Sequence, residues 1–147
     1  MEITALNKDT PLWEKTLLLA RNCSWKAGAS LASLMKNNCF RDWERVFAAV
    51  ENGEAVGFCT LTRFDSLPEN CGYSPFIGYV FVDEKYRGRH ISFTMIESVC
   101  AYAGSLGFKT VYICSSEVGL YEKSGFTKSM RLPTIYGTTE QLFFRKV

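Results

Sequence analysis

Apolar residues recur with two different spacings along this chain, and each spacing predicts one kind of element. Where they recur every three to four residues, one face of a helix is expected to be buried. This spacing predicts four helices, at residues 11–20, 28–37, 91–106 and 118–124. Pro11 follows a capping residue, as is typical of a helix start, and Gly107 and Gly125 are placed to end the last two helices.

Short runs rich in β-branched and aromatic residues predict strands between and after these helices. The runs lie at residues 46–50, 55–62, 76–82, 110–114, 126–131 and 140–147. Asn52 and Gly53, between the first two runs, are a strong signal for a tight hairpin. Residues 76–82 are apolar throughout, which is typical of a strand buried on both faces. The combination predicts a mixed α/β fold with a central sheet, in a single domain spanning residues 1–147.

Composition and charge narrow the class of protein. Of the 147 residues, 47% are hydrophobic and 22% are charged, which excludes a disordered chain or a fibrous repeat. The formal net charge of +2 is too small to indicate nucleic-acid binding. The apolar stretch at residues 17–20 is far shorter than the roughly 20 residues that a membrane span needs, and no basic leader precedes it. We therefore expect a soluble protein that binds neither nucleic acid nor a membrane.

The cysteines do not follow the spacing of a metal site. There are six of them, with no C-x-x-C pair and only one histidine in the chain, so a zinc site is not expected. Cys59, Cys100 and Cys114 fall inside apolar segments, where free cysteine behaves as a small buried hydrophobic residue. Reduced thiols and a cytoplasmic location are the preferred interpretation.

The segment at residues 82–92 is the first candidate for chemistry. It leaves the apolar strand, turns, and enters an amphipathic helix, so free backbone N–H groups and the positive end of the helix dipole converge there. Arg87 and Arg89 would add charge-assisted contacts to an anion, especially a phosphate. A solvated basic turn with no ligand is the alternative interpretation of this segment taken alone.

A second segment, at residues 119–126, reads Gly-Leu-Tyr-Glu-Lys-Ser-Gly-Phe. Together with the Arg-Gly turn about thirty residues earlier, it resembles the GNAT superfamily of acyl-CoA-dependent N-acyltransferases, and in particular its small bacterial-type N-acetyltransferases. The resemblance covers about residues 76–130. It implies a GNAT-like fold, with a central, twisted, mostly antiparallel sheet of about six to seven strands flanked by about four helices.

The resemblance also implies acetyl-CoA as cosubstrate and assigns residues to it. The cofactor-binding residues that it implies are Phe81, Val82, Arg87, Gly88, Arg89, His90, Ile91, Ser92 and Tyr121. The backbone of Phe81 and Val82 would pair with the pantetheine arm, and Tyr121 matches the family tyrosine that donates to the departing sulfur. The chain departs from the family pattern at His90, where the family has a loop glycine that permits close approach to a pyrophosphate.

The expected reaction also needs a group that accepts a proton from the amine. A lysine-like amine has a pKa of about 10.4, so freeing its lone pair at pH 7 costs about 4–5 kcal/mol. A carboxylate, or a water that one orders, would accept the proton. The candidates that flank or end predicted strands are Glu54, Asp65, Glu69, Asp83 and Glu117. Glu117, four residues before Tyr121 and within reach of the same helical turn, is the first choice as a catalytic residue.

Two functions from different classes follow from these patterns. The leading one is N-acetyl transfer from acetyl-CoA to a primary amine of a small molecule, peptide or protein. The alternative is a non-catalytic acyl-CoA-binding sensor or interaction domain on the same fold. The acceptor pocket is expected between the early helices and the loops at 64–75 and 132–139, with Trp25, Tyr73 and Tyr136 as candidate lining residues. The acceptor itself stays open, as does a homodimer through the C-terminal strands.

Overall fold

The computed structural model describes all residues 1–147. Its helices are α1 (Pro11–Asn22), α2 (Ala27–Lys36) and α3 (Ile91–Ser105). The hydroxyl of Thr10 caps α1 by accepting a hydrogen bond from the backbone N–H of Trp13 at 3.3 Å. Three short 3₁₀ turns lie in the connections, at Glu69–Cys71, Glu84–Tyr86 and Glu122–Ser124.

Seven strands form one sheet in the order β1-β2-β3-β4-β5-β7-β6. They are β1 (Glu2–Ala5), β2 (Arg45–Glu51), β3 (Glu54–Thr62), β4 (Phe76–Val82), β5 (Thr110–Ser115), β6 (Thr127–Pro133) and β7 (Thr139–Lys146). Every neighbouring pair is antiparallel except β4 and β5. Asn52 and Gly53 both have positive φ, as the tight β2–β3 hairpin requires. The predicted mixed α/β fold is therefore confirmed.

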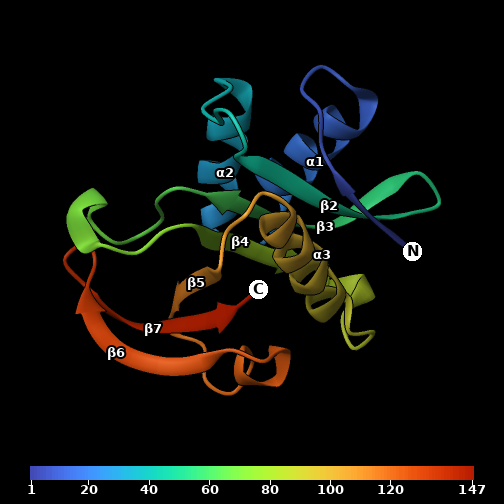
Figure 1. Ribbon diagram of the computed structural model, residues 1–147. Coiled ribbons are helices and arrows are strands. Elements are labelled where there is room, and N and C mark those ends of the chain that lie inside the picture. The colour runs from blue at the N-terminus through green and yellow to red at the C-terminus, as the bar shows by residue number, and fades with distance from the viewer.

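Alternation along the strands divides the buried side chains between the two faces of the sheet. On β2, Val46 and Ala48 pack against α1 and α2, whereas Phe47 and Ala49 pack on the opposite face with α3. Figure 1 shows α1 and α2 on one side of strands β2–β4 and α3 on the other. The core around α3 also includes Ile113 of β5, so it joins the two halves of the sheet.

The sheet opens between β4 and β5, its one parallel pair. The two strands are in register only at Phe76 and Tyr112, and beyond that pair they diverge. Tyr79 has a φ of 50° and lies at an irregularity in the β3–β4 pairing, which bends β4 in the region of the divergence. This opening positions the site described below.

Two sequence predictions about elements are wrong. The chain begins with a strand, β1, that the pattern did not indicate: it has four residues, two of them polar, and lies at the sheet edge. The helix expected at 118–124 is a bend followed by a single 3₁₀ turn, because Gly119 and Gly125 have φ near +82° and +83°, outside the helical region. The sheet is therefore flanked by three helices and not four.

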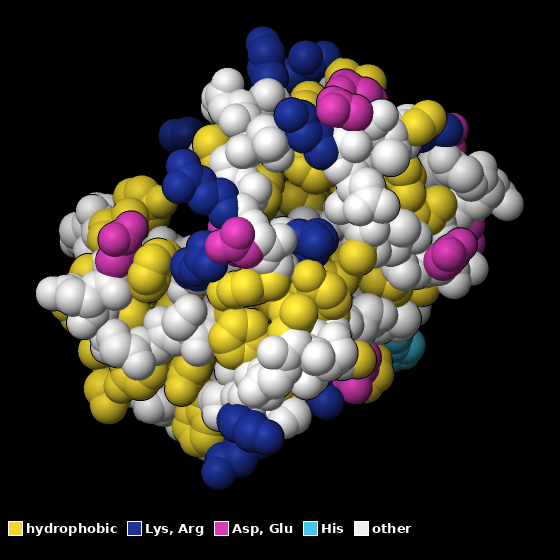
Figure 2. Space-filling model, turned by 45° about the horizontal axis from the view of Figure 1, so that its top comes forward, with side chains coloured by type: hydrophobic (Ala, Val, Ile, Leu, Met, Phe, Trp, Pro, Cys, Tyr) yellow, Lys and Arg dark blue, Asp and Glu magenta, His cyan; other side chains and the backbone are white.

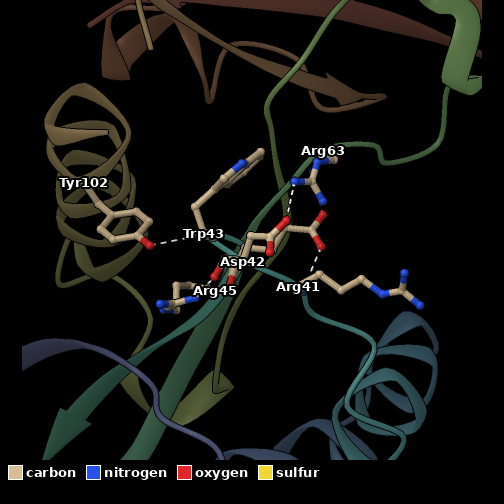
Figure 3. A network of polar contacts seen from close by, with 7 residues as sticks. Arg41, Asp42, Trp43, Arg45, Arg63 and Tyr102 are labelled. Atoms are coloured by element: carbon tan, nitrogen blue, oxygen red, sulfur yellow. Dashed lines mark hydrogen bonds and ion pairs between the residues drawn. The ribbon is translucent and has the colours of Figure 1, made fainter. Parts of the chain in front are cut away.

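A polar network fastens the connection between α2 and β2 to the end of β3 (Figure 3). The carboxylate of Glu44 accepts hydrogen bonds from the backbone N–H groups of Arg41 and Arg63, at 3.1 and 2.7 Å. The Arg63 guanidinium also pairs with Asp42 at 2.7 Å, and the Tyr102 hydroxyl of α3 donates to the carbonyl of Trp43 at 2.9 Å. The network fixes the point at which the chain leaves β3 for the loop at residues 63–75.

Charged side chains are distributed over the surface without a single dominant sign. On the face drawn in Figure 2, Lys and Arg side chains are interspersed with Asp and Glu, and hydrophobic side chains occupy much of the area between them. All six cysteines are free thiols, three of them buried. None of the helices is both long and apolar enough to cross a membrane.

Candidate active site

The main cleft of the molecule, of about 1010 Å³, occupies the opening between β4 and β5. Residues 77–82 of β4 and 113–115 of β5 form its sides. One end is closed by the turn that leads into α3, and the other by the loop after β3 and the start of β7. Figure 1 places these ends on opposite sides of the molecule.

The α3 end is built to receive an anion. Arg87, Gly88, His90, Ile91 and Ser92 line it, at the N-terminus of a fifteen-residue helix whose first backbone N–H groups have no partner within the helix. Gly88 and His90 have φ of 83° and 59°, so both are in the left-handed region. Histidine tolerates this region better than most residues, which allows the turn to keep its shape where the family has glycine.

The two arginines of this turn behave differently. Arg87 lines the cleft, where its Nε donates to the carbonyl of Val82 at 3.0 Å. Arg89 does not line the cleft, because its guanidinium binds both carboxylate oxygens of Glu51, at 3.0 and 3.1 Å, and lies over the Tyr86 ring. The structure therefore separates Arg89 from the other residues that the sequence assigned to the cofactor.

Tyr121 lines the cleft and is buried against the aromatic side chains of Phe126 and Phe143. Burial is the main cause that raises the pKa of its hydroxyl to about 12, and the neighbouring Ser115 side chain opposes part of that shift. The phenol is therefore protonated at neutral pH and can donate a hydrogen bond. Arg145 of β7 supports this region, since it donates to the carbonyl of Ser124 at 2.8 Å and pairs with Glu97 of α3.

Glu117 lies at the rim of the same cleft, but its geometry differs from the sequence expectation. It is exposed, and it does not share a helical turn with Tyr121, because no helix forms over residues 118–124. Its charge still acts on Tyr121, where it contributes to the raised pKa.

Asp65 is a second carboxylate of the cleft, less exposed than Glu117. It is half-buried in the loop after β3, and its Oδ1 lies 2.9 Å from the point where a Cβ on Gly78 would be. Burial raises its pKa to about 6; a hydrogen bond with the Ser66 backbone opposes that shift, and the nearby negative charge of Glu140 adds to it. At neutral pH Asp65 is therefore mostly ionised and a stronger base than an ordinary aspartate.

The other three carboxylates named from the sequence lie outside the cleft. Glu54 pairs with Lys15 at 3.1 Å, Glu69 is exposed in the first 3₁₀ turn, and Asp83 accepts a hydrogen bond from the backbone N–H of Lys85. Only Asp65 and Glu117, of the five, line it. The sequence could not separate them, because the cleft brings together residues far apart in the chain.

Aromatic side chains form the walls at the Asp65 end. Trp25, from the connection between α1 and α2, lies parallel to Phe81 with ring centroids 6.0 Å apart. Tyr79 and Tyr136 also line this end, as the sequence predicted for Tyr136. Tyr73 does not, because it packs against Tyr112 outside the cleft.

Two further residues of this end were missed by the sequence analysis. Tyr79 belongs to a continuous apolar run that gives no sign of a bend, and Glu140 begins a strand, where an acidic residue is unremarkable. The carboxylate of Glu140 lies 3.4 Å from the Ser66 hydroxyl. Burial is the main cause that raises the pKa of Tyr79 to about 12, and the charge of Asp65 adds to it.

The cleft is therefore reached from both faces of the sheet. The turn before α3 and Tyr121 belong to the face covered by α3. Asp65 lies over Gly78, on the opposite face from Ile77, and Trp25 packs on the same side as α1 and α2. One molecule can bind along the α3 side while a second approaches from the other side.

Comparison with known proteins agrees with this arrangement. The model of the acetyltransferase (GNAT) family matches residues 12–126, most of the chain. The chain belongs to the GNAT acetyltransferase family. It is therefore an acyltransferase, as the two motifs indicated from the sequence. No curated protein matches it at the sequence level.

Solved structures of GNAT proteins share the fold over nearly the whole chain. An aminoglycoside 6′-N-acetyltransferase from Enterococcus faecium has a TM-score of 0.74 at 18% identity, covering 99% of this chain and 97% of its own. A GNAT acetyltransferase from Elizabethkingia anophelis, solved with acetyl-CoA bound, has a TM-score of 0.69 at 18% identity, with the same coverage. A ribosomal-protein-alanine N-acetyltransferase from Brucella melitensis has a TM-score of 0.69 at 18% identity and covers 100% of both chains.

Proposed function

We propose that this GNAT protein transfers an acetyl group from acetyl-CoA to a primary amine, with the whole chain acting as one domain. The observation that carries the proposal is the single cleft that joins an anion-binding turn, a buried protonated tyrosine and a half-buried carboxylate. These are the groups that transfer from a phosphate-bearing thioester to an amine requires. The cytoplasmic location stays a prediction.

Acetyl-CoA supplies the thioester carbonyl and the thiolate leaving group. In this proposal its pyrophosphate lies on the turn lined by Arg87, Gly88, His90, Ile91 and Ser92. Its pantetheine arm lies along the part of β4 that contains Phe81 and Val82, where β5 has diverged. Arg89 is left out of this set because Glu51 holds its guanidinium.

Tyr121 is the proposed donor to the leaving sulfur. A phenol with a raised pKa donates a hydrogen bond to developing thiolate charge, and it keeps its own proton at neutral pH. Burial among apolar side chains strengthens this contact, because water does not compete for it.

Asp65 is the proposed base, in preference to Glu117. The incoming amine must lose a proton, and a carboxylate with a pKa near 6 accepts it more readily than one with an ordinary value. Asp65 also lies on the face of the sheet opposite to α3, from which a second substrate can approach. Glu117 is exposed at the rim and is not held in a buried part of the cleft.

The test combines binding with turnover. Calorimetry and thermal unfolding should show acetyl-CoA binding, with a stabilisation of roughly 2.7 kcal/mol at a hundred times the dissociation constant. Release of free thiol should then depend on an added amine, screened over aliphatic amines, an aminoglycoside and a peptide with an N-terminal alanine. The last two represent the activities named for structural neighbours.

Three variants separate the assigned roles. Tyr121→Phe should lower kcat at least tenfold with acetyl-CoA affinity nearly unchanged, whereas Tyr73→Phe, outside the cleft, should behave as the wild type. Glu117→Gln should lower kcat/KM less than Asp65→Asn does. Unchanged turnover in Tyr121→Phe would remove its role, and binding without turnover of any amine would favour a sensor.

A further inference from the structure

Two carboxylates at the acceptor end of the cleft have no cationic partner in the chain. Asp65 and Glu140 both line this end, and neither takes part in any of the four ion pairs of the structure. The only basic or titratable nitrogen side chains that line the cleft are His90 and Arg87, whose guanidinium lies over the Phe81 ring, and neither forms an ion pair with Asp65 or Glu140. The acceptor end is therefore negatively charged and open to a positively charged molecule.

A buried hydroxyl without a partner lies beside the same place. The Oγ1 of Thr60 is buried on β3 and makes no hydrogen bond. It lies 3.3 Å from the point where a Cβ on Gly78 would be, and Asp65 Oδ1 lies 2.9 Å from the same point. Thr60 itself does not line the cleft, and Gly78 has no side chain, which lets Asp65 approach the β4 backbone closely at this end.

The walls of this end favour an apolar frame that carries cationic groups. Trp25, Tyr79 and Tyr136 line it, and aromatic faces attract both aliphatic carbon and ammonium groups. Ser66 links the two carboxylates in space, because it follows Asp65 in the chain and its hydroxyl lies 3.4 Å from Glu140. The carboxylates of Asp65 and Glu140 therefore face one space, which is lined by these three aromatic side chains and is called the aromatic chamber below.

We propose that the acceptor carries two ammonium groups on a short apolar frame, one placed at Asp65 for reaction and the other paired with Glu140. The proposal rests on the acetyltransferase function given above. An α,ω-diamine, a polyamine or a rigid amino sugar all present this chemistry. An amine with a single charge would leave Glu140 unpaired inside the cleft, which lowers its affinity.

The chemical step balances with the groups named. Asp65 takes one proton from the first ammonium, and the freed nitrogen attacks the thioester carbonyl carbon. The new C–N bond forms as the C–S bond breaks, and the thiolate leaves beside Tyr121. As the amide forms, the second proton of the nitrogen is delivered to the CoA thiolate, and Asp65 releases the first proton to solvent, so the products are the acetamide, CoA as free thiol and one proton. The second ammonium, at Glu140, keeps its proton throughout.

The test compares matched acceptors in thiol-release assays at saturating acetyl-CoA. 1,4-Diaminobutane, spermidine and kanamycin carry several ammonium groups, whereas 1-aminobutane and 4-amino-1-butanol carry one. We expect kcat/KM to be at least tenfold higher for a doubly charged acceptor than for 4-amino-1-butanol. Which of the three is preferred identifies whether a diamine, a polyamine or an amino sugar fits the chamber.

Glu140→Gln should reduce that ratio to near one, and Glu69→Gln, an exposed acid outside the cleft, should leave it unchanged. Equal kcat/KM for singly and doubly charged amines in the wild type would overturn the inference and leave the proposed function intact. If no amine is acetylated although acetyl-CoA binds, the proposed function fails. In that case, calorimetric titration of the CoA complex with 1,4-diaminobutane tests the two-charge site on its own. Binding that is lost in Glu140→Gln supports the site, and no binding to the wild type overturns it.

Discussion

Asp65 is held in an environment that makes it a better base at the expense of stability. An aspartate in the unfolded chain has a pKa of about 3.9, whereas burial raises the folded value to about 6. Between these two values the folded state binds more protons than the unfolded state, so the free energy of unfolding falls as pH rises from about 4 to 6. Above pH 6 the full penalty of ionising Asp65 is present.

Asp65→Asn is therefore expected to stabilise the protein at pH 7 while it removes activity. Thermal unfolding should show the variant more stable than the wild type at pH 7, on the order of 2 kcal/mol, with the difference lost near pH 4. The wild-type kcat/KM should rise with pH to a plateau through an apparent pKa near 6, and the variant should be 10²–10⁴-fold less active, roughly. An equal stability difference at both pH values would contradict this account.

Single residues also show which parts of the candidate site could be predicted from the sequence and which could not. The turn before α3 and Tyr121, which line the cleft, could be picked out from the sequence because each lies in a local motif. Glu140 and Thr60 could not, since each becomes distinctive only when the β3, β4 and β7 segments meet around Gly78. The role that a carboxylate can take depends on its burial, which the sequence does not reveal for five similar acidic residues at strand ends.

At the scale of elements, the network around Glu44 determines how the loop at residues 63–75 starts. The Glu44 carboxylate holds the backbone N–H of Arg63, two residues before Asp65, at 2.7 Å. It also holds the backbone N–H of Arg41 (Figure 3). The position of the proposed base is thus tied to the connection between α2 and β2.

Glu44→Ala should leave both of these backbone donors without their acceptor. We expect a loss of about 1–3 kcal/mol in the free energy of unfolding, measured by urea titration, together with a higher KM for the amine. Asp42→Asn is the matched control, because it weakens only the exposed ion pair to Arg63 and should cost much less stability than Glu44→Ala. If the two variants lose the same stability and keep the same KM, Glu44 does not position the loop.

Most helices and strands were predicted close to their observed bounds, and two elements were not. The strand at 76–82 was placed with its observed bounds, and the predicted helix at 91–106 differs from α3 by one residue. β1 was missed because four residues at an edge carry too little pattern. The helix at 118–124 did not form because Gly119, within it, and Gly125, directly after it, take positive φ. The bend at Tyr79 had no signal at all within its apolar run.

At the scale of the whole molecule, the two faces of the sheet provide two separate approaches to one reaction point. In the proposed function, acetyl-CoA and the amine therefore need not displace each other, and we expect both to be bound when reaction occurs. Initial rates measured over a grid of both substrate concentrations should give intersecting double-reciprocal lines. Parallel lines would indicate an acetylated enzyme instead. Cys114, the thiol in the cleft, does not favour that route, because burial raises its pKa to about 11.

The single register pair between β4 and β5 also affects how rigidly the two halves of the sheet are held together. Little backbone pairing connects the half-sheet formed by β1–β4 to the half-sheet formed by β5, β7 and β6. An extended molecule that pairs with the free edge of β4 lies across this seam and adds contacts between the two halves. Occupancy is then expected to stiffen the domain against relative motion of its halves, so that cosubstrate binding also sets the rigidity of the surface that receives the amine.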